Sequence, residues 1–188
     1  MGKLVETRKG AAVATAAEAP AQYLTFSLGG EMFAVAILNV KEIIEFGSLT
    51  EIPMMPAFIR GVINLRGSVV PVIDLSARFG SKPTEVGRRT CIVIVEAPDE
   101  DDVRHDIGII VDAVSEVLEI PSSEIEPPPS FGAKIRADFI FGMGKVAGKF
   151  VILLNINKVL SVEEIALLTS TDTGTPEGQI APGAIRTT

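Results

Sequence analysis

The sequence predicts an all-β fold of two small barrels with a few short helices. Of its 188 residues, 47% are hydrophobic but only 5% are aromatic, so the core must consist of Val, Ile, Leu and Ala. The dominant pattern is a series of short aliphatic runs bounded by Gly, Pro or charged residues, which is typical of strands. The third observation is an internal repeat, in which the two halves of the chain carry matching runs.

The chain divides into a folded centre and two tails. Residues 1–21 and 170–188 are rich in Ala, Thr, Gly and Pro and lack apolar periodicity, so we expect two flexible tails. Between them, we expect residues 22–86 to form the first barrel and residues 87–169 the second. This length suits one ordinary domain or two small ones.

Seven aliphatic runs are expected to be strands. They cover residues 23–28, 32–37, 62–65, 69–74, 90–96, 107–111 and 149–155. Gly29 and Gly30 separate the first two runs and predict a tight hairpin turn. Residues 40–44 (VKEII) fit a short strand or a turn, and periodicity does not decide between the two.

The expected helices are short and follow recognisable caps. Asp74 is placed to cap a helix over residues 75–79. Ser161 and Glu164 form a capping-box pattern that opens a C-terminal helix over residues 162–168.

The repeat aligns two pairs of segments. A shift of 74 residues places 33–44 (FAVAILNVKEII) on 107–118 (IGIIVDAVSEVL), and a shift of 81 places 58–75 on 139–156. Matched positions include Val40 with Val114, Glu42 with Glu116, Gly61 with Gly142, Gly67 with Gly148, and Asp74 with Asn155. Each repeat is expected to form a closed or nearly closed antiparallel barrel, because closure removes the exposed edges of short strands.

The charge distribution argues against nucleic acid and membrane partners. Residues 96–106 contain six acids against one base, Arg104, and so carry −5 of the net charge of −7. We expect this segment to be a solvated hairpin tip. Nucleic acid and anionic membranes attract clusters of Lys and Arg instead, and no apolar run approaches the roughly 18 residues of a membrane span.

Signatures of catalysis are weak. The single His, His105, lies among acids, and the single Cys, Cys91, begins an aliphatic run without a second Cys or a neighbouring His. No phosphate-binding glycine pattern occurs, and the acidic stretch lacks the ligand spacing of a calcium loop. We therefore expect no cofactor and no metal; a carboxylate- or metal-dependent enzyme centred on the acidic loop is the disfavoured alternative.

A binding module without chemistry of its own is the remaining interpretation. Arg66 lies at the expected turn of an otherwise uncharged block, where it fits either a solvated turn residue or a bidentate contact with a partner carboxylate.

Residues 58–75 (FIRGVINLRGSVVPVIDL), preceded by residues 40–44 and 52–53, closely resemble the CheW family of chemotaxis coupling proteins. The resemblance extends from about residue 22 to 168. It implies two intertwined five-stranded SH3-like β-barrels with a groove between them. It also implies a non-catalytic cytoplasmic adaptor that is recruited to receptor arrays. Such an adaptor connects the cytoplasmic tip of chemoreceptors to the regulatory domain of the histidine kinase CheA. Other CheW-like domains are further implied partners, and another chemosensory pathway, such as pilus motility, is the alternative output.

The resemblance also suggests which residues contact partners. Val40, Glu42 and Arg66 match family positions at partner surfaces, and Gly61 and Asn64 match positions that shape the Arg66 turn. In the second half, the family strand that helps to line the receptor groove corresponds to the segment of this chain that contains Ile110, Val111 and Val114.

Overall fold

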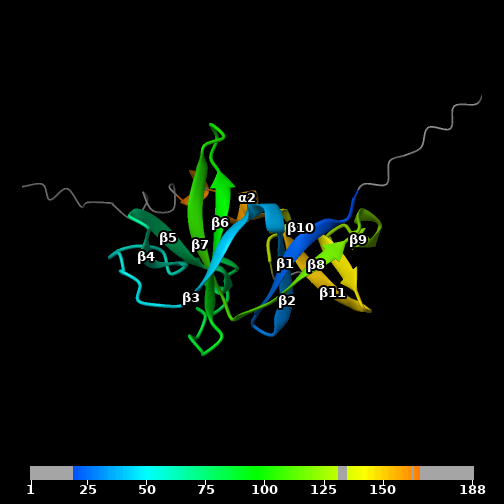
Figure 1. Ribbon diagram of the computed structural model, residues 1–188, viewed down its shortest axis with the longest axis horizontal. Helices are drawn as coiled ribbons and strands as arrows, with labels where there is room; N and C mark the ends of the chain where they lie inside the picture. The colour runs from blue at the N-terminus through cyan, green and yellow to red at the C-terminus, as the bar shows by residue number, and fades with distance from the viewer. Residues whose placement is uncertain (1–18, 131–134, 162, 166–188) are drawn as a thin grey trace, which may run out of the picture.

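The chain forms two β-sheets that lie side by side (Figure 1). The computed structural model describes residues 19–130, 135–161 and 163–165. The first sheet has the order β8-β1-β2-β11-β10-β9 and the second the order β3-β6-β7-β5-β4. The strands of the first sheet are β1 (Ala21–Leu28), β2 (Glu31–Ala36), β8 (Ala113–Ile120), β9 (Ile125–Glu126), β10 (Ile140–Val146) and β11 (Lys149–Leu154). Those of the second are β3 (Val40–Glu45), β4 (Ile59–Leu65), β5 (Ser68–Asp74), β6 (Cys91–Pro98) and β7 (Arg104–Val111).

The sequence repeat is a structural repeat. The two sheets have the same strand order when strands are matched by the repeat. In that match β3, β6, β7, β5 and β4 of the second sheet correspond to β8, β1, β2, β11 and β10 of the first. The small strand β9 adds a sixth member to the first sheet. Its counterpart in the second sheet is a single bridge between Thr50 and Val62. The all-β fold with two five-stranded repeats is therefore confirmed.

The two halves do not close into separate antiparallel barrels, which corrects one expectation. After β2 the chain crosses to the second sheet, where β3 pairs with β6, and after β7 it crosses back, where β8 pairs with β1. Each sheet also holds one parallel pair, β2 with β11 and β5 with β7. Segments 22–86 and 87–169 thus each contribute strands to both sheets, and the barrels are intertwined.

The main core joins the two sheets into one body. Its buried cluster contains Phe26 and Phe33 from the first sheet together with Val93 and Ile109 from the second. The rings of Phe26, Phe33, Phe79 and Phe139 form a continuous series with centroid separations of 6.2, 5.7 and 6.0 Å. This shared burial joins the two barrels, and each sheet also has a smaller buried cluster of its own, around Leu153 in the first and Ile94 in the second.

Most of the expected strands are present with shifted ends, and residues 40–44 fall within the strand β3. Gly29 and Gly30 form the expected turn with φ of 56° and 84°, and residues 99–103 form the expected hairpin tip. The sequence did not identify β8, β9 and β10 as strands. In β8 three consecutive exposed residues interrupt the apolar pattern, and in β10 glycines do.

The helices are short, as expected. They are α1 (Leu75–Arg78), α2 (Ile156–Val159), η1 (Ile37–Asn39), η2 (Ser122–Glu124) and η3 (Ala137–Phe139). Asp74 caps α1 by accepting a hydrogen bond from the Ala77 N–H at 3.3 Å. Residues 163–165 are helical, but the rest of the expected C-terminal helix and nearly all of both expected tails lie outside the described residues.

Candidate partner-binding site

Arg66 lies at the tip of the β4–β5 hairpin and points into solvent. Leu65 pairs with Ser68, which leaves Arg66 and Gly67 as a two-residue turn with φ of 51° and 87°. Two positive φ values define the turn type that matches strand twist. The Asn64 side chain accepts a hydrogen bond from the Gly67 N–H at 2.8 Å, and the Arg66 side chain is 78% exposed. The turn therefore presents the guanidinium on the surface.

Glu42 on β3 orients this guanidinium. Arg66 Nη2 donates a hydrogen bond to Glu42 Oε2 at 3.0 Å, and the Glu42 side chain is only 25% exposed. Exposed ion pairs of this kind typically contribute about 0.2–1 kcal/mol to stability. The pair contributes little to holding the fold together, but it fixes the direction of two opposite charges on a surface.

Lys41 connects this pair to the acidic hairpin. Its ammonium lies 2.8 Å from Asp106 Oδ1 and 3.0 Å from Glu96 Oε1. Hydrogen bonds to Asp106 and Glu96 raise the pKa of Lys41, and hydrogen bonds from Lys41 and Arg104 lower the pKa of Glu96. The strand β3 is thereby tied to β6 and β7 at the edge of the Arg66 site. Sequence reasoning missed Lys41, although it lies next to Glu42 and is a cation in a strand otherwise rich in β-branched residues.

Two adjoining hollows surround these charges. The first, which we call the Arg66 surface, has a volume of about 390 Å³ and is lined by Lys41, Glu42, Leu65, Arg66, Ser68 and Asp106. The second, the β5–β7 hollow, has a volume of about 430 Å³. Lys41, Ser68 and Asp106 line both, so the two hollows adjoin each other.

Gly61 shapes the base of the hairpin and is itself buried. Its φ is 148°, and a Cβ at this position would overlap the carbonyl of Thr50. Thr50 and Val62 exchange two backbone hydrogen bonds of 2.9 Å directly beside it. Gly61 therefore allows the segment before β4 to pack against the strand, while Asn64 acts at the turn.

The remaining predicted contact residues separate into two groups. Val40 and Val114 are half-buried and pack against the main core. They occupy equivalent positions on β3 and β8, the strands with which the chain enters the opposite sheet after each crossing. Ile110 and Val111 are fully buried. Both side chains lie in the buried half of β7, where Val111 belongs to the main core and Ile110 to the cluster of the second sheet, so neither reaches the surface in this structure.

Asp99 makes most of the polar contacts at the acidic hairpin tip with neighbours in the same hairpin. Asp99 Oδ1 accepts hydrogen bonds from the N–H groups of Asp101 and Val103, and Asp99 Oδ2 lies 2.8 Å from His105 Nε2. Within the described ranges, no group of three or more His, Cys, Asp or Glu residues is arranged to hold a metal ion. No helix in this part of the chain is long and apolar enough to cross a membrane.

Comparison with known proteins decides the family. The family model of the CheW-like domain matches residues 22–164, which is most of the chain. The chain belongs to the CheW family. The chemotaxis protein CheW of Klebsiella aerogenes is 35% identical over 147 residues, which cover 78% of this chain and 86% of the relative. The crystal structure of the scaffolding protein TtCheW from Thermoanaerobacter tengcongensis is similar with a TM-score of 0.68 and 37% identity, covering 76% of this chain and 88% of that one.

CheW proteins are coupling and scaffold proteins of chemotaxis, and this chain is one of them. The family consists of non-catalytic adaptors in signalling. Protein FrzA of Myxococcus xanthus is also similar, with 30% identity over 151 residues that cover 79% of this chain and 91% of the relative.

Proposed function

We propose that this CheW protein links the cytoplasmic tip of chemoreceptors to the regulatory domain of CheA, in the cytoplasm beneath receptor arrays and without catalysis of its own. The exposed Arg66–Glu42 pair carries this proposal. An oriented pair of opposite charges contributes little stability but selects partners, because a partner with the wrong charges leaves them unpaired on binding. Other CheW-like domains are further candidate partners of the same surface.

The kinase domain is assigned to the Arg66 surface. Arg66 presents free guanidinium donors to a partner, since Glu42 uses only one of the terminal nitrogens. A guanidinium can bind a carboxylate through two parallel hydrogen bonds, which sets the orientation of the partner as well as its affinity. Leu65 provides an apolar wall beside these charges.

The receptor tip is assigned to the region where the chain crosses between the barrels. Val40 and Val114 form its half-buried base, and Leu38 on η1 is 88% exposed. Ile43 on β3 is 44% exposed. A helical hairpin with an apolar face buries such side chains on docking, which is the usual mode of helix-in-groove recognition.

The proposal is tested with Arg66→Ala and a matched exposed control, Arg88→Ala. We expect Arg66→Ala to weaken binding of the CheA regulatory domain by roughly tenfold or more, as at interface hot spots. Because Arg66 is exposed, the free energy of unfolding should change by less than about 1 kcal/mol. Titration calorimetry with each variant measures the affinity. Equal affinities for the wild type, Arg66→Ala and Arg88→Ala contradict the assignment.

A second candidate output is a chemosensory pathway other than chemotaxis, which the similarity to FrzA supports. The shared fold and the Arg66 surface suit either output. Affinity capture from the native cell, followed by identification of the kinase that co-purifies, separates them. Recovery of a kinase from pilus motility or another chemosensory pathway would favour the second.

A further inference from the structure

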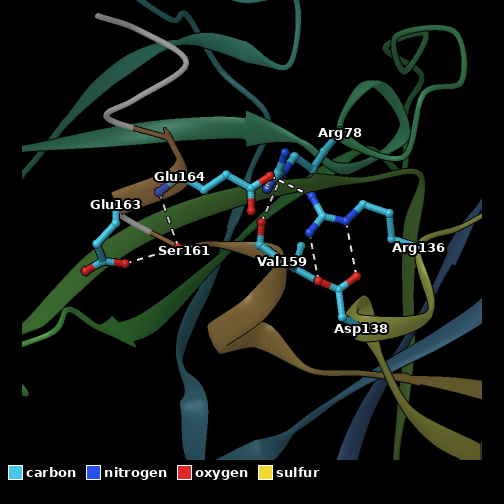
Figure 2. A network of polar contacts seen from close by, with 7 residues as sticks. All are labelled: Arg78, Arg136, Asp138, Val159, Ser161, Glu163 and Glu164. Atoms are coloured by element: carbon cyan, nitrogen blue, oxygen red, sulfur yellow. Dashed lines mark hydrogen bonds and ion pairs between the residues drawn. The ribbon is translucent and has the colours of Figure 1, made fainter.

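The last described residues are Ser161 and the helical residues 163–165, which together we call the C-terminal turn. The Ser161 hydroxyl accepts a hydrogen bond from the Glu164 N–H at 3.3 Å, and the Ile165 N–H donates to the Ser161 carbonyl at 2.9 Å. The Glu164 side chain does not return to the start of the turn as in a complete capping box. It points instead toward two arginines from distant parts of the chain (Figure 2).

The first arginine, Arg78 at the end of α1, is almost completely buried. Its side chain is 6% exposed, and its guanidinium carbon lies 5.1 and 4.9 Å from the ring centroids of Phe58 and Phe139. Nε donates a hydrogen bond to the Val159 carbonyl at 3.0 Å, and Nη2 lies 3.2 Å from Glu164 Oε1 (Figure 2). A buried guanidinium needs a counter-charge, because an uncompensated one strongly destabilises the fold.

The second arginine, Arg136, approaches the same carboxylate. Arg136 Nη1 donates to Glu164 Oε1 at 2.7 Å, and the guanidinium also pairs with Asp138 and lies 4.5 Å from the centroid of the Phe139 ring. Burial raises the pKa of Glu164, but the hydrogen bond from Arg136 and the nearby charge of Arg78 outweigh this and hold the pKa below its ordinary value. Glu164 is thus an ionised carboxylate shared by two guanidinium groups.

The other side of the turn faces the β5–β7 hollow. Glu163 Oε1 accepts a hydrogen bond from the Glu100 N–H at the tip of the acidic hairpin at 3.0 Å. Ile165 packs against the main core and lines the hollow, beside Ile107. The contacts of Glu163 and Glu164 therefore fix the position of one wall of the hollow.

We propose that Ile165 contacts the kinase domain bound at the Arg66 surface, and that Arg78, Arg136 and Glu164 are positioning residues for it. This inference rests on the proposed function. The two hollows adjoin through Lys41, Ser68 and Asp106, so a partner seated on Arg66 lies next to the β5–β7 hollow and reaches it. Val69, which is 72% exposed, and Pro71 give this hollow an apolar lining that Ile165 extends. The occupant of the β5–β7 hollow is an apolar side chain of the kinase regulatory domain. It lies next to the carboxylate of the same domain that binds Arg66.

The experiment compares two variants of the full chain with matched controls. Ile165→Ala removes the contact and is paired with Val86→Ala, an aliphatic residue of similar size that is 51% exposed in the loop after α1. Glu164→Gln removes the charge but keeps the shape, and is paired with Glu124→Gln on exposed η2. Calorimetric titration with the CheA regulatory domain measures affinity, and amide hydrogen exchange at Glu100 and Ile165 reports whether the turn stays in place.

We expect Ile165→Ala to weaken kinase binding roughly fivefold to tenfold, with exchange at Glu100 unchanged. Glu164→Gln should weaken binding to a similar extent and also speed exchange at Glu100 and Ile165. A merely structural role of Glu164 would speed exchange and leave affinity unchanged, which overturns the inference.

The failure of this inference is distinguishable from failure of the proposed function. If Arg66→Ala weakens binding but Ile165→Ala and Glu164→Gln do not, the inference is wrong and the proposed function stands. If none of the three variants weakens binding, both are wrong.

Discussion

Replacing Gly61 by Ala should destabilise the protein far more than the same change at Gly67 or Gly47. Alanine at a strongly positive φ costs about 1–3 kcal/mol in backbone strain. Its Cβ would also overlap the Thr50 carbonyl and break the two backbone hydrogen bonds between Thr50 and Val62, each of which contributes about 1 kcal/mol. We therefore expect the free energy of unfolding to fall by about 4 kcal/mol in all.

Two other glycines separate these causes. Gly67 has φ of 87° but no atom within 4 Å of an added Cβ, so Gly67→Ala should cost only the strain of about 1–2 kcal/mol. Gly47 has free space and no positive φ, so Gly47→Ala should have an effect of about zero. Urea unfolding followed by circular dichroism measures all three. A loss for Gly61→Ala no larger than that for Gly67→Ala refutes the steric argument.

Two further predictions concern buried and acidic groups. Asp74 is fully buried and accepts hydrogen bonds from Arg60 Nη1 at 2.8 Å and from the N–H and hydroxyl of Thr84, so Asp74→Ala should lower the unfolding free energy by about 3 kcal/mol. Its repeat counterpart Asn155 makes no side-chain cap hydrogen bond, so Asn155→Ala should lower the unfolding free energy by less than about 1 kcal/mol in the same urea assay. Equal losses of unfolding free energy for Asp74→Ala and Asn155→Ala would contradict the role of the Asp74 contacts. The pKa of Glu164 is lower in the folded protein than in the unfolded chain, so the unfolded chain takes up this proton first as pH falls. The stability that ionised Glu164 contributes is therefore fully present above its ordinary pKa of 4.5. It is lost as pH drops through the lower pKa of the folded state. Stability measured from pH 6 to pH 3 should therefore fall less steeply in Glu164→Gln than in the wild type, and identical profiles would show that Glu164 does not contribute.

The sequence was sufficient to identify the strands with continuous apolar runs, the hairpin turns and the repeat. Alignment of Gly67 with Gly148 was informative because both occupy positive φ in equivalent turns. The exchange of β3 and β8 was not predictable from periodicity, because alternation shows which residues face a core but not which sheet a strand joins. Each strand would satisfy its apolar face in either sheet, and only three-dimensional packing decides.

The Arg78 network was missed for a related reason. In the 81-residue alignment Arg78 falls on Val159, which is fully buried. A charged residue at an apolar position of the repeat was the available signal, but its counter-charge on Glu164 lies far away in the sequence. Similarly, Ile110 and Val111 matched family positions by sequence, while their complete burial became evident only in the folded sheet.

The crossing of the chain between the sheets also determines the order in which the protein can be completed during synthesis. The hairpin of β1 and β2 is made first, but its two neighbours, β8 and β11, are made much later. The second sheet has all its strands once β7 leaves the ribosome, whereas the first sheet must wait for β11. Until then both edges of the β1–β2 hairpin carry unpaired backbone groups, which favour association with other chains, and such long-range pairing folds slowly. The N-terminal hairpin is therefore the first structure to form and the last to be protected.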